Sequence, residues 1–179
     1  MEIIKYPEKS TWDDILKRPA FDTSSLDEKV SVIMNEVKAD GDVAVKKYTK
    51  MFDGTEIDVL EVSKKELDEA ANEIGDDLKK AIDVAIKNIT AFHKAQKSEE
   101  VRVTTQNGVE CWQKPVAIEK VGLYIPGGTA PLFSTVLMLA IPALIAGCKE
   151  IILCSPPSKE GKLNAGILYS ASKVGVRKI

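Results

Sequence analysis

The sequence predicts an α/β fold in which an N-terminal helical region and a β-hairpin lead into an incomplete Rossmann-like parallel βαβ domain. Three patterns support this fold class. Apolar residues recur at helical spacing before residue 98, a turn signal separates two β-rich runs near residue 107, and strand-like and helix-like runs alternate after residue 119. We therefore divide the chain into a helical region, 1–98, and a region that holds the hairpin and the first βαβα units, 99–179.

Four helices are expected in the first region. They span residues 26–37, 43–52, 64–74 and 78–96. Gly41 separates the first two helices, because glycine favours the end of a helix. Ser63 followed by Glu66 is a capping box, which predicts the start of the third helix, and Gly75 is expected to end it. The fourth helix is amphipathic, so its apolar face is expected to pack against another element.

The second region alternates between strands and helices. Asn107-Gly108 is a two-residue turn signal and predicts a hairpin of residues 101–105 and 109–112. Beyond it we expect strands over 121–125 and 150–154, helices over 131–146 and 163–174, and the start of a third strand over 176–179. Such a series favours a parallel sheet with right-handed crossovers. Pro142 predicts a kink or an early end in the first of these helices, because proline lacks a backbone N–H and crowds the preceding turn.

The first strand of the series runs into a glycine turn, Pro126-Gly127-Gly128, at the sheet edge where ligands bind in open α/β folds. Pro131 is expected in the first turn of the next helix, whose unpaired N–H groups would face a bound anion or cofactor phosphate. Turn glycines let a ligand approach the backbone without meeting a Cβ atom. The spacing differs from the GxGxxG fingerprint, so a nucleotide site and a purely structural turn both remain open on the pattern alone.

Composition and charge exclude several classes of partner. The 179 residues are 44% hydrophobic, and 25 basic against 27 acidic residues give a net charge of -2, so we expect binding to neither nucleic acid nor a membrane. The N-terminus lacks the basic and apolar segments of a signal peptide, and no apolar run reaches the roughly 18 residues of a membrane span. A cytoplasmic protein is the expectation.

The sequence offers no complete metal or catalytic centre. His93 is the only histidine, and one imidazole cannot form a zinc site without other ligands, so we expect it to form hydrogen bonds on or between helices. The cysteines Cys111, Cys148 and Cys154 form no CxxC pair. We expect them to be buried thiols.

Several long blocks of the chain occur in the order in which one enzyme family has them: NITAFHKAQ, WQKP, GLYIPGG, APLFSTVLMLAIPA and IAGCKEIILCSPP. Through these blocks the chain resembles histidinol dehydrogenase, the zinc enzyme of histidine biosynthesis that oxidises L-histidinol to L-histidine with NAD. The resemblance implies that Tyr124 contacts NAD, with Pro126, Gly127 and Gly128 beside it. It also implies an intertwined homodimer whose zinc ligands and proton-transferring Glu-His pair lie in the half of the family's length that this chain lacks. No catalytic or metal-binding residue is therefore assigned.

We expect the chain to be the N-terminal part of such an oxidoreductase and to be inactive alone. A second hypothesis is a stand-alone module that holds a nucleotide or a small anion on the glycine turn without catalysis. A third is a structural or interaction fragment in which the turn binds nothing. NAD binding that is weakened by Tyr124→Ala would separate the second hypothesis from the third.

Overall fold

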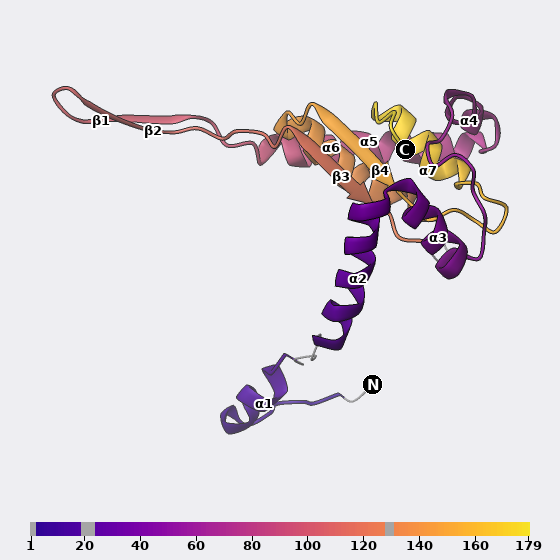
Figure 1. Cartoon of the computed structure of the whole chain (residues 1–179). Coiled ribbons are helices and arrows are strands. Elements are labelled where there is room, and N and C mark those ends of the chain that lie inside the picture. The colour runs from indigo at the N-terminus through magenta and orange to yellow at the C-terminus, as the bar shows by residue number, and fades with distance from the viewer. Residues whose placement is uncertain (1–2, 19–23, 128–130) are drawn as a thin grey trace. The chain divides into compact units, whose positions relative to one another are not determined.

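The parallel strand pair that the sequence predicts is present in the computed structural model of the chain (Figure 1). The structure describes residues 3–18, 24–127 and 131–179. Strand β3 (Lys120–Tyr124) pairs with β4 (Glu150–Cys154) so that Tyr124 lies opposite Cys154. The pairing extends one residue further, because the Ile125 N–H donates to the Cys154 carbonyl at 2.9 Å. The segments that follow β3 and β4 therefore leave the sheet side by side, at its carboxyl edge.

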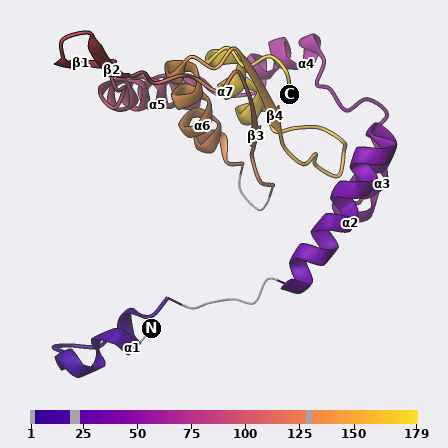
Figure 2. The ribbon, with the colours of Figure 1, turned by 60° about the vertical axis from the view of Figure 1, so that its left-hand side comes forward.

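Three helices build the core beside this strand pair. They are α5 (Asp76–Ala95), α6 (Phe133–Ala146) and α7 (Ala165–Lys173). Ile125 and Leu153 at the ends of the two strands are fully buried, in one apolar cluster with Val136 of α6 and Ala171 of α7. Helix α5 packs against α6 through a second cluster around Ile82, and the two helices lie next to each other in Figure 2. The α/β class is confirmed, with one parallel pair of strands packed against helices.

The remaining elements of the described residues are η1 (Lys9–Thr11), α1 (Trp12–Leu16), α2 (Ser24–Asp40), α3 (Asp42–Asp53), α4 (Lys64–Glu69), η2 (Ala70–Asn72), β1 (Val101–Gln106) and β2 (Val109–Gln113). Helices α2 and α3 confirm the first two predicted helices, and Gly41 between them has a φ of 56°. The chain forms two compact units, Met1–Ala44 and Val45–Ile179. The boundary after residue 98 stays a prediction.

The capping box is present at the start of α4. The Glu66 N–H donates to Ser63 Oγ at 3.2 Å, and the Ser63 N–H donates to Glu66 Oε2 at 3.0 Å. The helix is shorter than predicted, because it ends at Glu69 and passes into the 3-10 turn η2. Gly75 does not end it. With an extended ψ of 156°, Gly75 is the N-cap residue of α5, whose first turn carries two aspartates that favour a helix start.

Helix α6 differs from the prediction at its start. It begins at Phe133, with Leu132 as N-cap in a non-helical conformation, so Pro131 precedes the helix instead of lying in its first turn. Pro142 does not end α6 early, because the helix continues to Ala146 and Gly147 ends it with a φ of 94°. The kink at Pro142 stays a prediction.

The last elements are shorter than the pattern suggests. Helix α7 begins at Ala165 because the Asn164 side chain accepts a hydrogen bond from the Gly166 N–H at 2.8 Å. At the C-terminal end, a single parallel bridge joins Ile152 to Lys178, where a third strand was expected.

No helix of the described residues is long and apolar enough to cross a membrane.

The predicted hairpin is present as β1 and β2, which pair antiparallel with Gly108 at a φ of 80° in the turn. On one face Val103 lies opposite Cys111, and on the other Arg102 lies opposite Trp112. The Arg102 guanidinium lies 5.5 Å from the Trp112 ring centroid. All residues of both strands are exposed.

Candidate functional site

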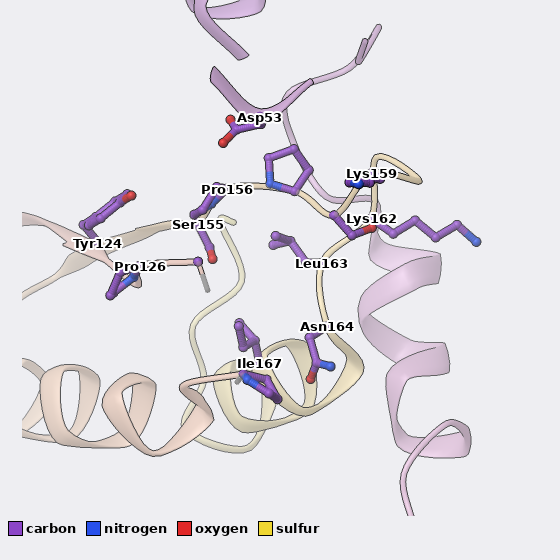
Figure 3. Close-up of a pocket in the computed structure, with 14 residues that line it drawn as sticks. Asp53, Tyr124, Pro126, Ser155, Pro156, Lys159, Lys162, Leu163, Asn164 and Ile167 are labelled. Carbon is purple, nitrogen blue, oxygen red and sulfur yellow. The ribbon is translucent and has the colours of Figure 1, made fainter. Parts of the chain in front are cut away.

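A cavity of about 620 Å³ lies at the carboxyl ends of β3 and β4 (Figure 3). Its walls come from the end of α3, the turn after β3, the loop after β4 and the start of α7. The lining residues are Asp53, Tyr124, Pro126, Gly127, Pro131, Ser155, Pro156, Pro157, Ser158, Lys159, Lys162, Leu163, Asn164 and Ile167. The position agrees with the sheet edge at which the sequence places a ligand site.

Three of the four residues predicted to bind a cofactor line this cavity: Tyr124, Pro126 and Gly127. Gly128 lies outside the described residues. The Tyr124 side chain extends from the last residue of β3 and is 63% exposed, so its ring is free for a ligand to stack on it or bond to its hydroxyl. That role stays a prediction.

The wall opposite the glycine turn is the loop of residues 155–164, which folds on itself. The Ser158 N–H donates to the Lys162 carbonyl at 2.8 Å, and the Gly161 N–H donates to the Ser158 carbonyl at 2.9 Å. A third bond fixes the loop from outside, since the buried Thr55 hydroxyl donates to the Lys159 carbonyl at 3.2 Å. This bond holds the loop beside the segment that follows α3, which explains how Asp53 comes to line the cavity.

Sequence reasoning missed Asp53 and the loop after β4 as parts of the site. The loop was visible as the run Ser155-Pro156-Pro157, directly after a strand that ends at the ligand-binding edge, so topology gave a usable signal for it. No local pattern points to Asp53. Its place depends on the contact between Thr55 and Lys159, which are 104 residues apart in the chain.

Three charged residues line the cavity: Asp53, Lys159 and Lys162. In Figure 3 the Lys162 side chain runs away from the other lining residues. The pKa of Glu66 is lowered chiefly by the hydrogen bonds from Ser63, and the positive charge of Lys162 adds to that shift. The cavity therefore offers an aromatic ring, a carboxylate, two lysines and the backbone of a glycine, which is a set suited to binding.

The other candidate residues lie apart from this cavity. His93, near the C-terminal end of α5, places its Nδ1 atom 2.7 Å from the Gln96 Oε1 atom, in agreement with the expected hydrogen-bonding role. The expectation of buried cysteines is wrong: Cys111 and Cys154 are exposed and Cys148 is half-buried. Cys111 lies on the projecting hairpin and Cys154 on the last position of β4, and neither position is covered by another described element.

Within the described ranges, no three His, Cys, Asp or Glu side chains lie close enough together to hold a metal ion. The described residues by themselves therefore do not form a zinc centre.

Comparison with known proteins gives a consistent set of relatives. The sequence model of the histidinol dehydrogenase family matches residues 16–179. A histidinol dehydrogenase of Bacteroides fragilis is 56% identical over all 179 residues, which correspond to 42% of that relative. A histidinol dehydrogenase of Escherichia coli K12 is 49% identical over 166 residues, covering 92% of this chain and 37% of the relative.

Among solved structures, the crystal structure of histidinol dehydrogenase from Elizabethkingia anophelis superposes with a TM-score of 0.89 at 42% identity. The superposition covers 96% of this chain and 40% of that one. The chain thus spans less than half the length of the relatives that it matches.

Proposed function

Because the chain belongs to the histidinol dehydrogenase family, an oxidoreductase family, we propose that it is the NAD-binding part of an enzyme that oxidises L-histidinol to L-histidine in two steps. The observation that carries this proposal is the cavity at the carboxyl edge of the parallel strand pair, which is lined by Tyr124, Pro126 and Gly127. Nucleotides bind at this edge in open α/β folds.

The lining residues suit the parts of NAD. The exposed Tyr124 ring offers a face for stacking on an aromatic ring of the cofactor, and its hydroxyl offers a hydrogen bond. The Asp53 carboxylate accepts hydrogen bonds, which is the chemistry that binds the hydroxyls of a ribose. Gly127 has no side chain, so only its backbone lines the cavity at the turn. When bound, NAD supplies the hydride acceptor for the oxidation.

The same proposal implies that the chain has no dehydrogenase activity by itself. The cavity lining includes no histidine to move protons, and the described residues offer no cluster of zinc ligands. We propose that zinc and the acid–base groups act in the remaining part of a full-length enzyme, which works as a cytoplasmic homodimer on a small-molecule substrate. The nearly balanced charge supports the absence of a nucleic-acid or membrane partner.

Titration of the purified chain with NAD tests the binding proposal. Tyr124→Ala is expected to weaken binding roughly tenfold, the effect of losing about 1.4 kcal/mol of stacking and hydrogen-bonding free energy. Phe92→Ala is the matched control, because Phe92 on α5 is 64% exposed but does not line the cavity. Equal NAD affinity of the Tyr124→Ala and Phe92→Ala variants would contradict the assignment of Tyr124.

NADH formation from L-histidinol, NAD and zinc tests the proposed inactivity, with a full-length histidinol dehydrogenase as the positive control. The chain is expected to give no turnover above background. Turnover that persists after removal of host enzymes would mean that this chain carries its own acid–base groups.

A further inference from the structure

The glycine turn after β3 and the loop after β4 lie close to each other at Gly127 and Pro156. A Cβ atom built on Gly127 would lie 2.6 Å from Pro156 Cγ, 3.6 Å from its Cβ and 3.8 Å from its Cδ. Carbon atoms in contact are ordinarily about 3.5–4.0 Å apart, so any side chain at residue 127 would overlap the proline ring. The Pro156 ring therefore occupies the space in which a side chain of residue 127 would lie.

The proline ring has little freedom to retreat from this contact. Pro156 is followed by Pro157, and both rings fix their φ angles and restrict the preceding residue. Further along, the loop is held by the bond from Ser158 to Lys162 and by the bond from Thr55 to Lys159. On the other side, the turn starts from Ile125, which is fully buried and hydrogen-bonded to β4. A larger residue 127 must therefore push the two segments apart.

Both residues line the cavity, so their contact sets its geometry. Tyr124 lies three residues before Gly127, and Asn164 and Ile167 on the far wall follow from the loop of Pro156. A change in the spacing between turn and loop changes the distance between the Tyr124 ring and that wall. Ligand affinity depends on such positions, because a site that is displaced by about 1 Å loses much of its preorganisation.

We propose that Gly127 and Pro156 act as a pair of positioning residues: the glycine accepts the proline ring, and the contact fixes the width of the cavity. The choice of NAD as ligand rests on the proposed function. The contact between Gly127 and Pro156 is independent of that function, because it is a packing contact of the chain itself. Neither residue is assigned a catalytic role.

A double-mutant cycle tests this pair with the full 179-residue chain. Gly127→Ala is expected to weaken NAD binding about tenfold, and Pro156→Ala about threefold, because it leaves a gap without a clash. The double variant is expected to bind within about threefold of the original chain, since the smaller residue 156 makes room for the new methyl group. Gly122→Ala in β3 is the matched control, because a Cβ atom there meets nothing within 4 Å.

Recovery in the double variant would show that the two residues act through their mutual contact. If the double variant binds as weakly as Gly127→Ala, or if Gly127→Ala binds as the original chain does, the pair does not position the site. If Gly127→Ala fails to fold, folding of the double variant supports the contact, and failure of both variants overturns it.

A readout without ligand separates this inference from the proposed function. Amide chemical shifts of Tyr124 and of residues 158–162 are expected to change in Gly127→Ala and to return toward their original values in the double variant. If no variant binds NAD but these shifts follow that pattern, the proposed ligand is wrong and the positioning pair stands. Unchanged shifts in Gly127→Ala would overturn the pair, whatever the ligand.

Discussion

Leu153→Ala tests the core that supports the cavity. Leu153 is the fourth residue of β4, is fully buried, and packs in the cluster that joins the strand pair to α6 and α7. The substitution removes three carbon atoms, which at about 0.8 kcal/mol for each buried methylene is a transfer loss of about 2.4 kcal/mol. The cavity left between sheet and helices adds to this loss. We therefore expect the free energy of unfolding to fall by about 3.5 kcal/mol.

Ile152→Ala is the matched control for this substitution, because Ile152 is the preceding residue of the same strand and is 40% exposed. Its smaller buried part loses about 1.4 kcal/mol, and no closed cavity remains on the exposed side of the strand. Urea unfolding followed by circular dichroism gives both values from the midpoint and slope of the transition. If the two variants differ by less than about 1 kcal/mol, the strand does not separate a closed core from an exposed face, and the reasoning fails.

Two further predictions concern the capping box at α4. Ser63→Ala is expected to lower the free energy of unfolding by about 1 kcal/mol, because the Glu66 N–H loses its acceptor, and an unchanged urea midpoint would contradict this. The Ser63 bonds lower the pKa of Glu66 below its ordinary 4.5, so they stabilise the fold above that pH and lose this effect as the pH falls through the lowered value. The urea midpoints of the original chain and of Glu66→Gln are therefore expected to converge as the pH falls from above 4.5 through the lowered pKa of Glu66. A difference that stays constant with pH would refute the linkage.

The local signals in this sequence predicted the elements that depend on neighbouring residues. Asn107-Gly108 placed the hairpin, the Ser63 capping box placed α4, and the strand over 150–154 has the predicted bounds. These signals work because turn geometry, capping and alternation involve atoms only a few residues apart. Gly75 shows the limit, since a glycine suits the end of one helix and the start of the next equally well in sequence.

The sequence by itself determined the class of fold, the resemblance to an enzyme family and the strand end at which Tyr124 lies. Only the tertiary structure decided which residues face that strand end. The contact of Gly127 with Pro156, and the place of Asp53 in the cavity wall, arise from packing between segments that are far apart in the chain. Such contacts depend on how strands and helices fill space together, and no pattern of neighbouring residues carries that information.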